Sequence, residues 1–204
     1  MANYIKYNFR KILLVITIIL FSSSFYFFGK SIYILGKAEV GQILLNIAWE
    51  KTLSSQNNIR PWPSADYYPF AQLSIPSGEK FIVLSNTSGH SLAFGPTFFE
   101  KSSYPGKKGR SLISMHRDTH GQFLKDLRKG DLLNLKTKEG LLLHYKIKFI
   151  TIIDSSKNKL QLKSQENELI LYTCYPFDSI NTGGSMRFVV QAILLKDLIG
   201  KHYA

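Results

Sequence analysis

The sequence predicts an all-β barrel domain that follows an N-terminal transmembrane helix and an amphipathic helix. Three observations lead to this prediction. An uncharged apolar run of 18 residues lies near the N-terminus. From residue 68 onward, the apolar residues come in short runs separated by turn-forming residues, which is typical of strands. Six or seven such runs, with only one helical pattern among them, indicate a barrel or a sandwich, and we favour the barrel.

The first predicted element is a membrane anchor over Ile12–Gly29. Its helix would be about 27 Å long, close to the hydrocarbon thickness of about 30 Å. Its larger and nearer positive cluster, Lys6, Arg10 and Lys11, precedes it, so we expect the N-terminus in the cytoplasm and the remainder exported. A signal peptide cleaved near Ser22–Ser24 is the alternative. The apolar run continues beyond these serines, which favours an uncleaved anchor in the inner membrane.

An amphipathic helix is predicted next, over about Gly36–Leu53. Its apolar residues recur at i, i+3, i+4, i+7 and i+8, namely Val40, Ile43, Leu44, Ile47 and Ala48. A linker and a stiff segment rich in proline then lead into the domain. We therefore divide the chain into the tail and anchor (1–30), the amphipathic helix and linker (31–60) and the barrel (61–204).

The barrel strands follow from the short apolar runs. Pro76–Gly78 and Lys138–Gly140 resemble hairpin turns. Thr119–Leu127 is predicted to be helical, with Asp118 or Thr119 as its N-cap. The expected strands are 70–75, 80–84, 111–115, 131–136, 141–153, 168–174 and 188–195.

Composition limits the classes of function. The 26 Lys+Arg against 14 Asp+Glu give a net charge of +12, of which +5 falls in residues 1–60 and +7 in residues 61–204. Because no nucleic-acid-binding motif accompanies this spread of charge, we favour a basic surface facing an acidic envelope and expect no nucleic-acid partner. The single cysteine excludes an internal disulfide and zinc sites with two or more thiolates.

That cysteine, Cys174, is the candidate nucleophile. It ends the apolar run Leu169–Thr173, and Pro176 cannot continue a strand ladder. The thiol should therefore lie at a strand end, where a side chain can face a groove. An unpaired cysteine in an exported chain is also a candidate reactive thiol, although a lone cysteine is more often buried.

His116 is the candidate proton-transfer partner, and Arg187 the candidate donor to a developing oxyanion. His116 ends an apolar run, as Cys174 does, and Arg187 begins the next predicted strand after Cys174. Antiparallel neighbours would place Cys174 beside Arg187. The other histidines lie in a loop, at the start of the predicted helix, within a strand and near the C-terminus: His90, His120, His144 and His202.

These residues carry a resemblance to a known family. Ser114–Thr119 (SMHRDT), Leu171–Phe177 (LYTCYPF) and Arg187–Val190 (RFVV) resemble the His, Cys and Arg motifs of sortases, in order and at similar spacing. Pro61–Asp66 (PWPSAD) and Leu92–Pro96 (LAFGP) resemble, more narrowly, the class GN sortases of Gram-negative bacteria.

The resemblance covers about residues 36–196, with two departures. Met115 stands where these enzymes usually have a small residue, and Tyr67-Tyr68 follows the PWPSAD segment. Neither departure removes a catalytic group.

The resemblance implies a closed β-barrel and a membrane-bound cysteine transpeptidase. Its partner would be an exported protein with a C-terminal sorting signal resembling Leu-Pro-x-Thr-Gly, and its acceptor an amine of unknown identity. Cys174 would form a thioacyl intermediate, His116 would act as acid and then base, and Arg187 would bind the oxyanion or the substrate backbone. Thr173 would supply a further substrate contact, and Met115 would shape the rim near His116.

Asp118 and the acidic pair Glu166 and Glu168 are interpreted separately. Asp118 could orient the catalytic histidine, but we favour an N-cap or a partner for Arg117. No cofactor and no metal site are expected. Some sortases use calcium, which leaves Glu166 and Glu168 as the candidate acidic pair.

A free cysteine has a pKa of about 8.5 and a free histidine about 6.5, so a neighbouring pair at neutral pH is mostly thiol and neutral imidazole. We expect slow turnover and a bell-shaped pH–rate profile, measured as peptide cleavage against pH. A rate that climbs to pH 10 without a downturn would contradict His116 as a required acid.

Two alternatives remain open at this point. A cysteine peptidase on the same fold would release its substrate to water. A membrane-tethered barrel that binds a peptide or glycan without chemistry would not need Cys174, His116 and Arg187 together at strand ends.

Overall fold

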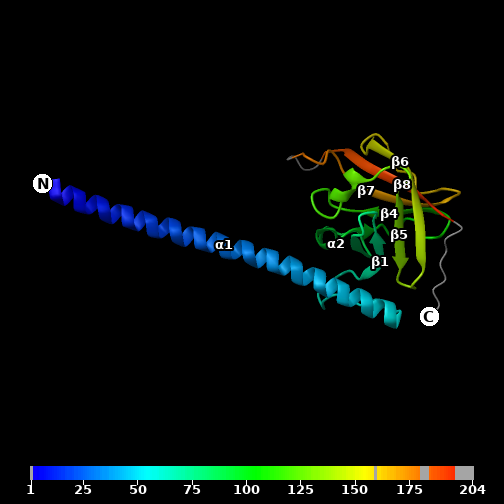
Figure 1. Ribbon diagram of the computed structural model, residues 1–204, viewed down its shortest axis with the longest axis horizontal. Coiled ribbons are helices and arrows are strands. Elements are labelled where there is room, and N and C mark those ends of the chain that lie inside the picture. The colour runs from blue at the N-terminus through cyan, green and yellow to red at the C-terminus, as the bar shows by residue number, and fades with distance from the viewer. Residues whose placement is uncertain (1, 159, 180–183, 196–204) are drawn as a thin grey trace. The chain divides into compact units, whose positions relative to one another are not determined.

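The computed structural model describes residues 2–158, 160–179 and 184–195 (Figure 1). The chain divides into two compact units, Met1–Gln42 and Ile43–Ala204. The first unit is helical, and the second contains the end of that helix and a closed β-barrel. Each unit is considered separately below.

Helix α1 runs from Ala2 to Ser55 without a break. It therefore spans both the predicted anchor and the predicted amphipathic helix. The part beginning at Lys11 is long and apolar enough to cross a membrane, by length and composition. Two of its hydroxyl groups bond within the helix: Thr17 and Ser31 each donate to the carbonyl four residues earlier, at 2.9 Å.

The last turns of α1 pack onto the barrel through a face that shares the buried Ala48 with the predicted stripe. Ile43 and Ile47 are exposed, whereas Trp49 is only 1% exposed. The buried face packs against the segment that enters the barrel and against strand β2 (Lys80–Leu84). The predicted apolar stripe did not include Trp49, because its spacing pattern was built from aliphatic residues alone. The buried cluster consists of Leu45, Trp49, Ala65, Tyr67, Ile82 and Leu84.

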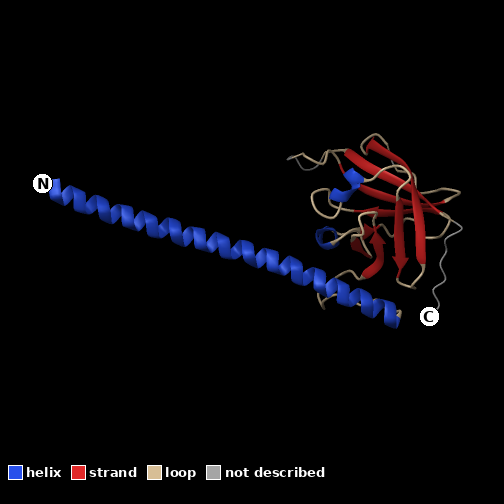
Figure 2. Cartoon of the chain, in the orientation of Figure 1, coloured by secondary structure: helices blue, strands red, loops and turns tan. Residues whose placement is uncertain are grey.

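Among the described residues, eight strands form a closed barrel in the order β1-β2-β3-β4-β7-β8-β6-β5, drawn in red in Figure 2. The β2–β3 and β4–β7 pairs are parallel, and the other pairs are antiparallel. This confirms the all-β prediction and the barrel. The strands are β1 (Pro69–Ser74), β2 (Lys80–Leu84), β3 (Thr97–Phe98), β4 (Gly109–Ser114), β5 (Leu132–Thr137), β6 (Leu142–Asp154), β7 (Asn167–Cys174) and β8 (Met186–Leu194).

Three local elements differ from the prediction. The two-residue strand β3 was not predicted, and neither was helix α2, Gly89–Phe94, which contains His90. The helix expected over 119–127 is a turn followed by the 3-10 helix η1, Gln122–Asp126. The N-cap of η1 is Gly121, with no side-chain hydrogen bond, so the predicted cap at Asp118 or Thr119 is wrong.

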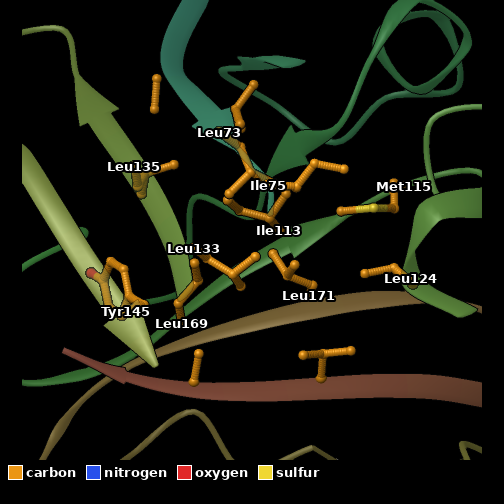
Figure 3. Close-up of a cluster of buried hydrophobic side chains, with 14 of the residues drawn as sticks. Leu73, Ile75, Ile113, Met115, Leu124, Leu133, Leu135, Tyr145, Leu169 and Leu171 are labelled. Atoms are coloured by element: carbon orange, nitrogen blue, oxygen red, sulfur yellow. The ribbon is translucent and has the colours of Figure 1, made fainter. Parts of the chain in front are cut away.

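Alternate residues of the strands fill the barrel, as the two-residue period requires. Figure 3 shows side chains from several strands meeting in one cluster, with Leu124 of η1 and Met115 at one side. The burial pattern of β4, in which every second residue is buried, leaves the residues between them on the outer face. Buried members include Leu73, Ile113, Met115, Leu124, Leu133, Leu135, Tyr145, Leu169, Leu171 and Val190.

Candidate active site

The barrel brings the three predicted catalytic residues to one end. Strands β4 and β7 are parallel, with Ser114 opposite Tyr172, and His116 and Cys174 each lie two residues further along. Strand β8 is antiparallel to β7, and its Arg187 lies directly opposite Cys174. Three strand ends from distant parts of the sequence thus form one edge.

Cys174 is the last residue of β7, and its side chain is exposed. The alternation of the strand accounts for this, since Leu171 and Thr173 are buried and Cys174 follows them. The second peptide bond after it, Tyr175–Pro176, is cis. The placement at an accessible strand end is the one expected from the sequence.

His116 is exposed, and its backbone is held by a close approach of Gly121. The Gly121 amide donates to the His116 carbonyl at 2.7 Å. A Cβ at Gly121 would lie 2.7 Å from that carbonyl oxygen and 3.0 Å from Thr173 Oγ1. Only glycine fits here without a shift, because the nearest atom belongs to the backbone. Sequence reasoning placed Gly121 in a helix and missed this role.

Arg187 is half-buried beside Cys174. Its Nη1 group donates to the Met186 carbonyl at 2.8 Å and also to the Gly184 carbonyl. These bonds tie the guanidinium to the start of its own strand. The arginine is therefore held at the same barrel end as the thiol.

Thr173 and Met115 lie inside the barrel. Thr173 is 2% exposed, and its hydroxyl donates to the Met115 carbonyl at 2.8 Å. Met115 is buried in the core. This burial does not fit the expected direct contacts with a substrate. Instead the pair joins the end of β7 to the segment that carries His116.

Asp118 contacts Arg117, in agreement with the interpretation favoured from the sequence. Arg117 Nε donates to Asp118 Oδ1 at 2.8 Å, and Nη2 donates to Oδ2 at 3.3 Å. The hydrogen bond from Arg117 lowers the pKa of Asp118, and the positive charges of Arg117 and His116 lower it further. The same hydrogen bond raises the pKa of Arg117.

Arg117 is the main residue that sequence reasoning missed. Its side chain is only 7% exposed, and it donates to the carbonyls of Pro176 and Ser179, each at 2.7 Å. Both carbonyls lie in the segment between β7 and β8. In a sequence, an arginine next to an aspartate indicates a solvent-exposed ion pair. The sequence therefore gave no indication that Arg117 is buried.

His120, the local competitor of His116, lies in the turn before η1 and not in a helix. Burial lowers its pKa, and the nearby His116 lowers it further, against an opposing hydrogen bond with the Ala93 backbone. Because its ring is largely enclosed while His116 is exposed, His116 is the better placed of the two to meet a substrate.

An aromatic cluster flanks the thiol. Tyr175 and Phe188 stack with ring centroids 6.3 Å apart, and Phe177 meets Phe188 edge-on at 5.1 Å. Phe177 and Phe188 also pack against the barrel core. The site therefore has an apolar wall directly beside Cys174, which sequence reasoning did not identify.

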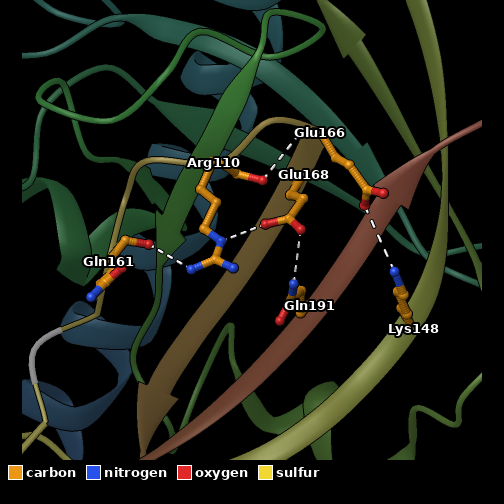
Figure 4. Close-up of polar contacts among 7 residues, drawn as sticks. Arg110, Lys148, Gln161, Glu166, Glu168 and Gln191 are labelled. Atoms are coloured by element: carbon orange, nitrogen blue, oxygen red, sulfur yellow. Dashed lines mark hydrogen bonds and ion pairs between the residues drawn. The ribbon is translucent and has the colours of Figure 1, made fainter.

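The acidic residues considered for calcium are both in ion pairs (Figure 4). Glu168 is buried between Arg110 and Gln191, and Glu166 pairs with Lys148 at 3.7 Å. In the described part of the chain, no group of three or more His, Cys, Asp or Glu residues is placed to hold a metal. Glu168 thus joins β7 to β4, and Glu166 joins the loop before β7 to β6.

Comparison with known proteins adds the family. A family model described as a sortase domain matches residues 73–195, which include His116, Cys174 and Arg187. Sortase D from Bacillus subtilis is 31% identical over 98 residues, which make up 48% of this chain and 50% of that protein. The chain thus aligns with half the length of this relative.

Solved structures show the same fold. The Clostridium perfringens sortase D5 transpeptidase has a TM-score of 0.61 at 19% identity, covering 77% of this chain and 99% of that chain. Sortase C-3 from Streptococcus pneumoniae has a TM-score of 0.56 at 24% identity, covering 78% and 83%. Sortase A from Corynebacterium diphtheriae has a TM-score of 0.57 at 19% identity, covering 76% and 84%.

Proposed function

Because the chain belongs to the sortase family, we propose that it is a membrane-anchored cysteine transpeptidase acting on exported proteins with a C-terminal sorting signal. The strand register is the observation that supports this most strongly. In this register, Cys174 of β7 lies opposite Arg187 of β8. His116 lies just after the end of β4, the other neighbour of β7. A nucleophile, a proton carrier and a cationic donor thus share one edge.

In the first half-reaction, the Cys174 thiolate attacks the carbonyl carbon of the scissile peptide bond in a signal resembling Leu-Pro-x-Thr-Gly. The tetrahedral intermediate carries a negative oxygen, to which Arg187 donates. Nη1 already binds two carbonyls, so the donors on Nε and Nη2 take this role. His116 gives a proton to the departing amine, the C–N bond breaks, and a thioacyl enzyme remains.

In the second half-reaction, an acceptor amine attacks the thioacyl carbon. His116 takes a proton from that amine, the C–S bond breaks, and the thiolate returns. The products are the new amide and the regenerated enzyme. The aromatic wall of Tyr175, Phe177 and Phe188 contacts apolar side chains of the signal and keeps water from one side of the thioester.

Helix α1 is the proposed anchor. Its apolar composition and length support a single crossing of the inner membrane. The basic residues before the apolar run support an N-terminus in the cytoplasm, and we therefore expect the barrel on the periplasmic side.

Membership in class GN is proposed from two segments that pack together. Trp62 of the PWPSAD segment meets Phe94 of the LAFGP segment with ring centroids 4.9 Å apart, and Tyr67 lies 5.7 Å from Trp62. Both segments surround the buried end of α1. Their role is therefore to fasten that helix end to the barrel.

The test incubates the full chain in detergent micelles with a Leu-Pro-x-Thr-Gly peptide library, with and without an added amine. Intact mass reads the outcome, and Cys174→Ala is the control. Transpeptidation predicts a thioacyl mass on Cys174 and an amine-linked product. Cleavage without that product would favour a peptidase. No adduct, together with full binding by Cys174→Ser, would favour a binding barrel.

A further inference from the structure

Arg117 makes four hydrogen bonds while almost completely buried. Two go to the Asp118 carboxylate and two to the backbone carbonyls of Pro176 and Ser179. A buried guanidinium is costly unless its donors are paired, so this arrangement is specific and not incidental. It engages three separate groups with one planar fork, which lysine cannot do.

The bonds of Arg117 connect the two halves of the proposed catalytic pair. Arg117 directly follows His116, and its two carbonyl acceptors lie two and five residues after Cys174. The backbone beyond β4 is thereby fastened to the backbone beyond β7. A second tie, from Thr173 to the Met115 carbonyl, joins the same two segments on the side of the core.

The charge of Arg117 is also close to the thiol. The electrostatic influence of Cys174 and of Asp178 contributes to the raised pKa of Arg117. Besides Cys174, the charged groups that act on Arg117 are Asp118 and Asp178, while His116 acts on Asp118 and Arg187 lies opposite Cys174. Arg117 is the member of this set that is buried.

We propose that Arg117 is a positioning residue that locks the Pro176–Ser179 turn to the His116 segment and so fixes the distance between the Cys174 thiol and the His116 imidazole. It also gives the thiolate a fixed positive neighbour. This inference rests on the proposed function for its turnover measurements. The two carbonyl bonds carry the role, because the Asp118 side chain is 65% exposed and an exposed pair contributes little.

The experiment separates positioning from charge with three variants of the full chain in detergent. Arg117→Gln loses the charge and most donors, Arg117→Lys keeps the charge but not the fork, and Asp118→Asn keeps both carbonyl bonds. Arg128→Gln, at an exposed arginine after η1, is the matched control. Each variant is measured for peptide kcat and KM and for the rate of Cys174 alkylation by iodoacetamide between pH 5 and pH 10.

For Arg117→Gln, we expect kcat to fall about 100-fold with little change in KM, because a misplacement near 1 Å has that effect. Cys174 should also be alkylated more slowly at a fixed pH, because the buried guanidinium that binds the turn after β7 is lost. Arg117→Lys should keep an alkylation rate near that of the wild type and still lose kcat. Asp118→Asn and Arg128→Gln should change neither quantity by more than about twofold.

Several outcomes would overturn the proposal. Equal behaviour of Arg117→Gln and Arg128→Gln would remove Arg117 from the site, and full kcat in Arg117→Lys would reduce its role to charge. Thermal unfolding is measured for every variant, and if Arg117→Gln does not fold, Arg117→Lys decides. If no protein turns over peptide but the alkylation rates change as expected, the proposed function fails while the effect of Arg117 on the thiol stands.

Discussion

The pairing of the Asp118 carboxylate with Arg117 makes the stability of the fold depend on pH. The hydrogen bond from Arg117 holds the pKa of Asp118 below its unfolded value of about 3.9. A depressed pKa in the folded state means that the ionised form stabilises the fold above the unfolded pKa. This contribution is lost as the pH falls through the folded pKa.

We therefore expect Asp118→Asn to unfold at a slightly lower urea concentration than the wild type at pH 6.5, with a difference that shrinks below about pH 4. The effect is small because the carboxylate is exposed. Urea unfolding at several pH values measures it, and Asp126→Asn, in the exposed part of η1, serves as the control. A difference that grows in acid would contradict the pairing.

Substitution of Gly121 tests whether its close approach to the His116 carbonyl holds the backbone that carries His116. An alanine Cβ would lie 2.7 Å from the His116 carbonyl oxygen and 2.9 Å from Met115 Cγ, so the backbone must move. We expect Gly121→Ala to cost about 1–3 kcal/mol of unfolding free energy and to lower kcat about 10- to 100-fold. Chemical denaturation and peptide cleavage measure the two effects.

The matched control is Gly89→Ala in α2, where nothing lies within 4 Å of the added Cβ. It should leave both quantities close to the wild type. Equal losses in the two variants would show that Gly121 has no special place under the site.

At the scale of elements, the end of α1 belongs to the barrel and not to a detached helix. Trp49 is buried against Tyr67, Ile82 and Leu84. We expect Trp49→Ala to lower the unfolding free energy by about 3–5 kcal/mol, since it removes a large buried side chain. Ile47→Ala, two residues earlier and 46% exposed, is the control and should cost much less.

Urea unfolding followed by tyrosine fluorescence measures both variants, because the Trp49 signal is absent from one of them. Equal costs for Trp49→Ala and Ile47→Ala would show that this helix end does not pack on the barrel in solution. A soluble fragment should accordingly begin before Leu45, and one that begins at Gln56 should lose stability.

The elements that the sequence predicted well were the strands formed by continuous apolar runs. The strands over 80–84 and 168–174 were placed within a residue of the observed bounds, because apolar runs bounded by turn residues are informative. Strand β3 has two residues and α2 has six, so neither presents a period. The helix predicted over 119–127 was wrong, because residues 119–121 form a turn in which the Gly121 amide donates to the His116 carbonyl, and η1 begins at Gln122.

The site was partly predictable for a related reason. Cys174, His116 and Arg187 lie where apolar runs stop or start, so their shared barrel end followed from the strands. Thr173 was expected to meet substrate, yet strand alternation turns it into the barrel. Arg117 could not be found, since its acceptors are backbone carbonyls 59 and 62 residues away in the sequence.

For the molecule as a whole, the predicted anchor is the feature most open to a direct test. We expect the full chain to stay with membranes after carbonate washing, because α1 offers an apolar span. A chain lacking residues 1–40, which keeps Trp49, should be recovered in the soluble fraction. Release of the full chain by carbonate would instead indicate a helix lying on the membrane surface.

Strand β8 lies between β6 and β7, although it follows both of them in the chain. The barrel cannot close before β8 is made, because β8 separates β6 from β7 in the sheet. Such long-range pairing folds slowly. The entry of β8 also brings Arg187 opposite Cys174. The step that closes the barrel therefore also completes the site. A chain in which β8 is not yet paired has no active site.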